Sequence, residues 1–350
     1  MSLDFVLLKK IAETPGAPGY EAPIRKLIIE EIKGLYDELQ IDPMGSIIAL
    51  KKGATDKKVM AAAHMDEIGF IVNHIDNEGF VRFQPLGGFD PKTLTSQRVI
   101  VHGKKDLPGV MGSKPIHIMK PEERKKSPEL QDYFIDLGLP KEEVEKWIEA
   151  GNTITRTGEL MRIGNGINGK SLDNRISVYV LIETLKSLKG RQIPYDFYAV
   201  FTVQEEVGLR GARTASSRIN PDFGFGLDTT IAYDLPGAQS HEMVTKMGNG
   251  AAIKIIDGTA IADYRMVEYL KGIADKQEIK WQSEILPAGG TDTAAIQQYG
   301  RGGSIAGAIS IPTRYLHQTI EMVNEEDVMH CVQLLTEAVS GIDQFDWTHK

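Results

Sequence analysis

Three short, largely apolar runs of this chain lead directly into histidine or carboxylate residues. They are 59–63, followed by His64 and Asp66; 197–203, followed by Glu205 and Glu206; and 223–227, followed by Asp228. A run of this kind predicts a strand that is buried on both faces, as in an α/β sheet covered by helices. Open α/β sheets place their sites at the carboxyl ends of such strands. The sequence therefore predicts a site of histidine and carboxylate side chains at that edge.

The segments around these runs indicate how the chain is organised. Apolar residues at helical spacing predict helices over 3–11, 24–35, 176–189, 267–274 and 325–339, and a further strand is expected at 47–50. From residue 67 to residue 166 the pattern changes to short strands at 70–72, 80–83 and 98–102, separated by Gly-rich turns. Such a pattern suggests a small β-barrel or sandwich. Within residues 67–166 we also expect an exposed loop at 121–132 and a short helix at 141–150. We expect an α/β domain of residues 1–66 and 167–350, interrupted by a β-rich insertion of residues 67–166.

Composition excludes several classes of protein. The chain has 40 Lys and Arg against 48 Asp and Glu, a net charge of −8, which argues against a nucleic-acid binder. Its single cysteine, Cys331, cannot form an intrachain disulfide or a thiolate zinc cluster. No apolar run reaches the roughly 20 residues of a membrane span, and the first residues do not resemble a signal peptide. We therefore expect a cytoplasmic protein with no membrane partner, in which any metal is held by histidines and carboxylates.

The first two strand ends suggest a division of labour. His64 and Asp66 are two residues apart and so face the same side of a strand, where one could bind a metal while Asp66 orients the imidazole. A surface pair after a strand is the alternative. Glu205 and Glu206 are adjacent carboxylates after a buried strand, an arrangement that is unfavourable unless a cation compensates it. One would be a metal ligand and the other a general base; the alternative is a solvated loop.

The remaining candidates are individually ambiguous. Asp173 precedes a helix and could be its N-cap, Asp228 could cap a turn, and His317 could be a core histidine. The turn Gly289–Asp292 could offer N–H groups to a substrate or be a plain capped turn. The other six histidines are expected to be structural or exposed. Taken together, histidines and carboxylates without cysteine suit zinc, cobalt or manganese.

Seven stretches in order along the chain match one family. They are 63–69 (AHMDEIG), 110–115 (VMGSKP), 134–138 (FIDLG), 172–175 (LDNR), 204–212 (QEEVGLRGA), 289–292 (GGTD) and 314–317 (RYLH). The chain resembles the tetrahedral aminopeptidases, the glutamyl or deblocking aminopeptidase family of dinuclear metallopeptidases, some of whose members carry a cellulase M or endoglucanase label. Phe89 stands where the family leads us to expect Trp, and Gln318-Thr319 follows His317 in place of a Ser-Pro-like pair. These departures bear on substrate preference and assembly, and no proposed ligand is affected.

The resemblance implies a role for each candidate. Asp173 would bridge two divalent metal ions, zinc or cobalt first and manganese as a further option. His64 and Asp228 would complete one site, Glu206 and His317 the other. Glu205 would be the general base, and Asp66 would orient His64. The implied fold is a mixed-sheet, three-layer catalytic domain of the co-catalytic zinc peptidase type with an inserted β-barrel dimerisation domain. Its dimers would assemble into a hollow tetrahedral dodecamer.

The predicted function is a metal-dependent aminopeptidase that removes N-terminal residues from peptides with a free N-terminus. The first alternative is an endo-1,4-β-glucanase, but a glycosidase uses two carboxylates and no metal, and the chain has only 3 Trp for stacking sugars. A different metal-dependent amidase is the second alternative, and a non-enzymatic binding protein is the third. The sequence does not indicate which first residue the enzyme prefers.

Overall fold

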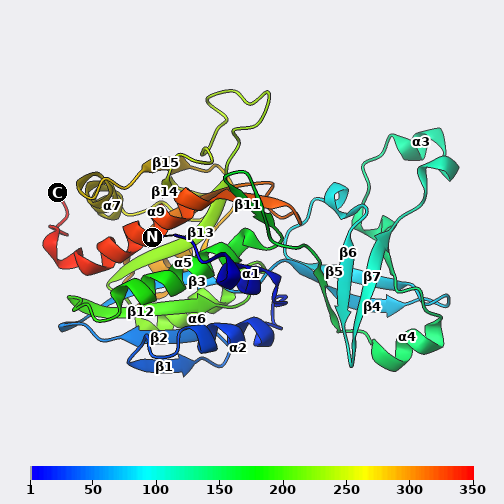
Figure 1. The fold of residues 1–350 in the computed structure, drawn as a ribbon, viewed down its shortest axis with the longest axis horizontal. Coiled ribbons are helices and arrows are strands. Elements are labelled where there is room, and N and C mark those ends of the chain that lie inside the picture. The colour runs from blue at the N-terminus through cyan, green and yellow to red at the C-terminus, as the bar shows by residue number, and fades with distance from the viewer. Residues whose placement is uncertain (1) are drawn as a thin grey trace.

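A mixed sheet of eleven strands forms the centre of the larger of two bodies in the computed structural model, which describes residues 2–350 (Figure 1). Nine strands follow one another in the order β1 (Glu38–Ile41), β2 (Ile47–Lys51), β12 (Tyr195–Thr202), β3 (Thr55–His64), β13 (Phe223–Ile231), β16 (Ile305–Arg314), β17 (Glu321–Asn324), β11 (Gly166–Gly169) and β10 (Met161–Ile163). Two more, β14 (Ala251–Ile256) and β15 (Trp281–Ile285), join the sheet through β16.

The central strands β12, β3, β13 and β16 are parallel, whereas the flanking strands pair antiparallel with them. The register pairs Thr202 at the end of β12 with His64 at the end of β3. The carboxyl ends of neighbouring strands therefore lie side by side. This confirms the strand arrangement on which the predicted site depends.

Helices cover both faces of the sheet because its central strands are apolar on both sides. In β3, Val59, Ala61 and Ala63 belong to the core beneath one helical layer, and Met60 and Ala62 belong to the core beneath the other. The first layer contains α1 (Phe5–Glu13), α2 (Ala22–Glu31), α5 (Leu172–Leu188), α7 (Tyr264–Lys276) and α9 (Glu325–Ser340). The second contains α6 (Arg210–Ile219) and α8 (Asp292–Tyr299). The three-layer α/β prediction is confirmed.

The smaller body is a closed antiparallel barrel with its own apolar core (Figure 1). Its strands follow the order β4 (Gly69–Ile75), β5 (Val81–Leu86), β8 (Phe134–Asp136), β7 (Asp106–Gly112), β6 (Arg98–His102) and β9 (Thr153–Arg156). All six fall inside the expected insertion, although β10 in the same range pairs with the large sheet. The division of the chain at residues 66 and 167 stays a prediction.

The expected elements differ from the observed ones mainly in their bounds, whereas α6, β1 and β14–β17 were not among those predicted. The segment expected as an exposed loop at 121–132 is exposed but contains the single-turn helix α3 (Pro121–Arg124). The short helix expected at 141–150 is α4 (Lys141–Trp147). Single 3₁₀ turns occupy Pro91–Leu94, Ile116–Ile118, Leu130–Asp132 and Ile342–Gln344. Within residues 2–350, no helix combines the length and the apolar character that crossing a membrane requires.

Close packing of α8 on the sheet depends on a glycine of β13. A Cβ atom added to Gly226 would lie 1.9 Å from Thr293 Oγ1. We expect Gly226→Ala to lower the free energy of unfolding by about 1–3 kcal/mol, because the helix must move away from the strand. Urea denaturation measures the change.

The matched control is Gly272→Ala in α7. Gly272 is exposed, and an added Cβ there meets no atom within 4 Å. Alanine should raise the free energy of unfolding at this site by about 0.5–1 kcal/mol, because it is the better helix former. Equal effects of the two substitutions would contradict the packing argument.

Candidate active site

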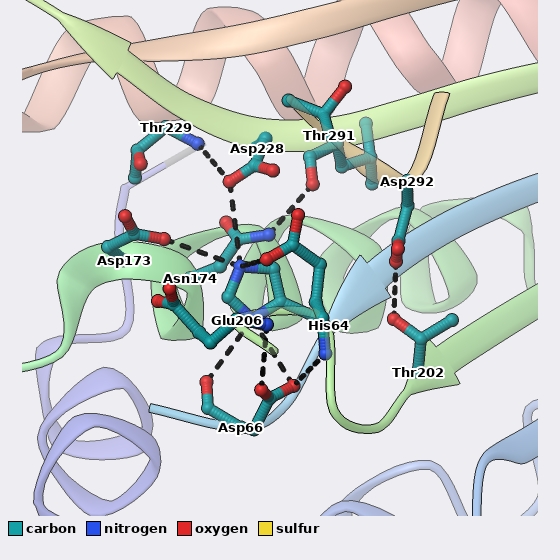
Figure 2. A network of polar contacts seen from close by, with 12 residues as sticks. His64, Asp66, Asp173, Asn174, Thr202, Glu206, Asp228, Thr229, Thr291 and Asp292 are labelled. Atoms are coloured by element: carbon teal, nitrogen blue, oxygen red, sulfur yellow. Dashed lines mark hydrogen bonds and ion pairs between the residues drawn. The ribbon is translucent and has the colours of Figure 1, made fainter. Parts of the chain in front are cut away.

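The structure brings all seven predicted site residues together at the carboxyl edge of the parallel strands. Figure 2 labels five of them: His64, Asp66, Asp173, Glu206 and Asp228. His64 ends β3 and is followed by Asp66; Glu205 and Glu206 follow β12; Asp228 lies in β13; Asp173 lies at the start of α5; and His317 follows β16. Six of the seven line one cavity of about 710 Å³, the exception being Asp66. A cavity of about 770 Å³ beside α9 contains none of them.

His64 lies at the centre of the cluster, with only 2% of its side chain exposed. Its Nε2 is 3.4 Å from Asp173 Oδ1, 3.7 Å from Glu205 Oε2 and 3.7 Å from Asp228 Oδ1. The other ring nitrogen, Nδ1, lies 3.2 Å from the carbonyl oxygen of Asp66. If Nδ1 donates its proton to that carbonyl, the Nε2 lone pair points at the three carboxylates.

His317 repeats this arrangement on the other side of Asp173. Its Nε2 is 3.3 Å from Asp173 Oδ2 and 3.6 Å from Glu206 Oε2, while its Nδ1 is 2.8 Å from the carbonyl oxygen of Gly88. Asp173 thus presents one carboxylate oxygen to each imidazole. Gly88 belongs to the segment after β5, so the barrel supplies the group that orients this ring. The alternatives of a core histidine and a helix N-cap do not describe His317 and Asp173.

The donor atoms fit divalent cations. Ligand atoms of His64, Glu205 and Asp228 lie within 4.8 Å of one another, as do those of His64, Asp173 and Glu206. In addition, the buried Glu206 Oε1 has no hydrogen-bond partner. Carboxylate oxygens and imidazole lone pairs that face one another repel unless protons or cations lie between them. The first group includes Glu205, so its assignment as base stays a prediction.

Asp66 ties the two acidic loop residues to the histidine. Its Oδ1 accepts a hydrogen bond from Glu205 N at 3.1 Å. Its Oδ2 accepts one from Glu206 N at 3.2 Å (Figure 2). The Asp66 side chain is fully buried. The sequence indicated the pairing with His64 but missed these two backbone contacts, because they join strands far apart in the chain.

Burial and mutual repulsion keep protons in this cluster. Burial, reinforced by neighbouring carboxylates, raises the pKa of Glu206 to about 8. It also raises the pKa of Asp228 to about 8 and that of Glu205 well above its usual range. For His317, burial opposes the charged form, but Asp173 and Glu206 outweigh it and raise the pKa to about 10. A divalent cation that binds here would therefore displace protons.

Two further acids belong to the site and were not assigned by sequence reasoning. Glu321 in β17 is fully buried and accepts a hydrogen bond from Asp173 N at 2.9 Å. Asp292, the last residue of the GGTD turn, accepts a hydrogen bond from Thr202 Oγ1, and burial raises its pKa to about 6. The turn gave a signal for Asp292, whereas Glu321 lies in a short strand without any motif.

A buried charge network joins the loop that follows His64 and β3 to the loop that leads into α5 and Asp173. Glu67 Oε2 accepts a hydrogen bond from Lys170 Nζ at 2.6 Å and one from Ser171 Oγ. Arg175 Nη2 lies 3.6 Å from Glu67 Oε1. The charged side chains of this network have at most 5% exposure, so it fixes the separation of the two loops from inside the protein.

The fold and the site together define a peptide hydrolase of the α/β class. The chain belongs to the M42 glutamyl aminopeptidase family, which matches it over residues 45–334. It is 41% identical over 336 residues to a putative aminopeptidase of Acetivibrio thermocellus, covering 96% of this chain and 98% of the relative. It is an aminopeptidase, and the resemblance to the tetrahedral aminopeptidases is confirmed.

Solved structures agree with this assignment. Aminopeptidase APDkam598 from the archaeon Desulfurococcus kamchatkensis is similar with a TM-score of 0.92 and 39% identity, covering 96% of this chain and 94% of that one. The Pyrococcus horikoshii TET1 peptidase, described as able to assemble into a tetrahedron or a large octahedral shell, has a TM-score of 0.86 and 31% identity over 95% and 98%. A Thermotoga maritima protein named endoglucanase has a TM-score of 0.79 and 30% identity over 95% and 96%.

The protons of the cluster predict how metal binding depends on pH. Without metal, Glu206 and Asp228 hold protons in the folded state up to about pH 8, whereas the unfolded chain releases them at their ordinary acidic pKa. These groups, together with His317 at higher pH, make the metal-free protein less stable as pH rises. Metal replaces the protons, so the rise in Tm on adding zinc to chelator-stripped protein should be larger at about pH 8 than at about pH 6.

Scanning calorimetry with and without zinc at both pH values measures this difference. His330→Gln is the control, because His330 lies in α9 and belongs to neither group of candidate ligands. It should leave the pH dependence of the zinc effect unchanged. A rise in Tm that is equal at both pH values, or larger at the lower one, would show that the cluster does not exchange protons for metal.

Proposed function

We propose that this aminopeptidase depends on two divalent cations and removes single residues from the free N-terminus of peptides. One observation carries the proposal: Asp173 offers one oxygen to each of two imidazoles, 3.4 Å from His64 Nε2 and 3.3 Å from His317 Nε2. A carboxylate placed in this way suits a bridging ligand. The further ligands would be Asp228 beside His64 and Glu206 beside His317. Zinc, cobalt and manganese all suit this donor set.

When bound, such cations polarise a peptide carbonyl and lower the pKa of a water molecule. Residues of the chain transfer the protons and orient the ligands. Glu205, whose Oε2 lies 3.7 Å from His64 Nε2, takes the proton of the attacking water and returns it to the nitrogen of the leaving peptide. Burial raises the pKa of Glu205, so its carboxylate is a stronger base toward water and holds the transferred proton between the two steps.

Asp66 and Gly88 orient the two histidine rings. The carbonyl oxygens of Asp66 and Gly88 accept the Nδ1 protons of His64 and His317, and so keep each Nε2 available as a ligand. The Asp66 carboxylate holds the backbone of Glu205 and Glu206 and thereby sets where their side chains begin.

The name of one similar structure makes endo-1,4-β-glucanase the second candidate. The geometry does not favour it, because a glycosidase needs two carboxylates that flank a sugar, and here the carboxylates converge on two imidazoles. A different metal-dependent amidase is the remaining candidate. It would differ from an aminopeptidase in cleaving substrates that have no free N-terminal amine.

We further propose that the barrel serves as a dimerisation domain in a homo-oligomer. The support is that PhTET1-12s, a similar structure with a TM-score of 0.86, is described as a dodecamer. A dodecamer of this chain and a cytoplasmic location both stay predictions.

A substrate panel on one metal-stripped preparation tests the activity. Zinc, cobalt or manganese is added back, and free-amine aminoacyl anilides, N-acetylated anilides and carboxymethylcellulose are offered separately. We expect metal-dependent cleavage of the free-amine anilides alone, because the amine is part of what the site recognises. Cleavage of acetylated anilides would indicate an amidase, and cleavage of cellulose with silent anilides would indicate the glucanase.

Glu205→Gln tests the proton transfer. Glutamine keeps the shape of the side chain but cannot take a proton, so kcat should fall by about 10²–10⁴-fold. Elemental analysis should find unchanged metal content. Glu206→Gln is the matched comparison one residue away, and it should lower the metal content because it removes a proposed ligand. Loss of metal from Glu205→Gln would make Glu205 a ligand, and retained activity would exclude it as the base.

A further inference from the structure

The cavity over the cluster contains one enclosed charge that the proposed mechanism does not use. Lys254 of β14 lines the cavity, and its side chain is only 1% exposed. Its Nζ donates a hydrogen bond to Asp257 Oδ2 at 3.0 Å and lies 3.1 Å from Glu284 Oε1. The ammonium is therefore already compensated by two carboxylates before any substrate enters.

Those two carboxylates have no exposed oxygen for a substrate. Asp257 Oδ1 accepts hydrogen bonds from Thr259 N and Ala260 N, each at 2.8 Å. Glu284 Oε1 accepts one from Thr230 Oγ1 at 2.7 Å, and the Glu284 side chain is fully buried. Glu284 Oε2 has no partner, but it is buried as well, and Glu284 is not among the residues that line the cavity.

The remaining described walls of the cavity hold only one other charged residue outside the cluster. Asp90 lies exposed at the edge, where its carboxylate accepts a hydrogen bond from Lys92 N. The large side chains along the walls are apolar: Phe89, Leu209, Ile231, Leu286 and Leu316. A side chain that enters thus loses water and meets mostly carbon.

We propose that this cavity selects an uncharged, apolar first residue of the leucine, methionine or phenylalanine type, with Leu286 forming part of the wall that it contacts. The proposal rests on the aminopeptidase function above and names its substrate class. An acidic side chain would lose hydration without gaining an uncompensated cation, and outside the cluster a basic one would find only Asp90, which lies exposed at the edge of the cavity. An acidic one would also approach two carboxylates that share one ammonium.

The test is kcat/KM of the metal-loaded enzyme on leucyl, methionyl, glutamyl and lysyl anilides. We expect the leucyl and methionyl substrates to exceed the other two by at least about tenfold. A glutamyl or lysyl substrate that equals or exceeds leucyl overturns the proposal. If an acidic side chain were bound by Lys254, the glutamyl substrate would lead and Lys254→Met would abolish that lead.

A binding measurement separates this proposal from the proposed activity. The shift in Tm of the metal-loaded protein is recorded with the α-amides of leucine, glutamate and lysine. A larger shift in Tm with the leucine amide supports the apolar cavity, even if no anilide is cleaved. Absence of anilide cleavage would contradict only the proposed aminopeptidase activity. Equal shifts, or a larger shift with a charged amide, contradict the proposal.

Leu286→Arg tests the wall directly. It places an uncompensated cation in the cavity, so the glutamyl-to-leucyl ratio of kcat/KM should rise by about tenfold. The matched control is Ile285→Arg, one residue earlier, because Ile285 is 59% exposed and does not line the cavity. An unchanged ratio in Leu286→Arg, or the same change in both variants, contradicts the placement of the first residue against this wall.

Discussion

The burial of four carboxylates around two imidazoles is the constraint on which the rest of this structure depends. Asp173, Glu205, Glu206 and Asp228 have side-chain exposures of 10% or less, and each lies within 4 Å of a histidine Nε2. Such a cluster is unfavourable in a protein interior unless protons or cations balance it. The parallel strands β12 and β3 end beside one another, β13 runs alongside β3, and α5 begins beside them, so these groups meet at one edge of the sheet.

The cluster keeps its shape because backbone groups and buried acids hold its members in place. Asp66 receives the N–H groups of Glu205 and Glu206, and Glu321 receives that of Asp173. These supporting acids are themselves fully buried, which leaves them few alternative positions. Sites built in this way lose precision when the supporting residues change, even though those residues never meet the substrate.

Sequence reasoning located the parts of the site that have a local pattern. His64, Glu205 and Asp228 could be found because each follows an apolar run of a buried strand. Most helices and the change to a barrel had equally local signals, whereas α6 was not predicted. The roles of Asp173 and His317 came from resemblance, because their local sequence also suited a cap and a core residue. Glu321 and Gly88 could not be found. Their contacts join residues 148 and 229 positions apart, and no spacing along the chain encodes such a contact.

The carbonyl of Gly88 on His317 means that the barrel is not a detachable module. Arg156 at the end of β9 adds a second link, since its Nη1 donates to the carbonyl oxygen of His317 at 2.8 Å. The inserted segment thus completes the α/β site as well as forming a separate body. If the barrel were exchanged between two relatives, Gly88 and Arg156 would be exchanged with it. A working chimera would therefore need residues at these two positions that hold the histidine of the recipient's α/β body in place. A substitution in the insertion that moves Gly88 or Arg156 would therefore disturb a histidine of the site in the larger body.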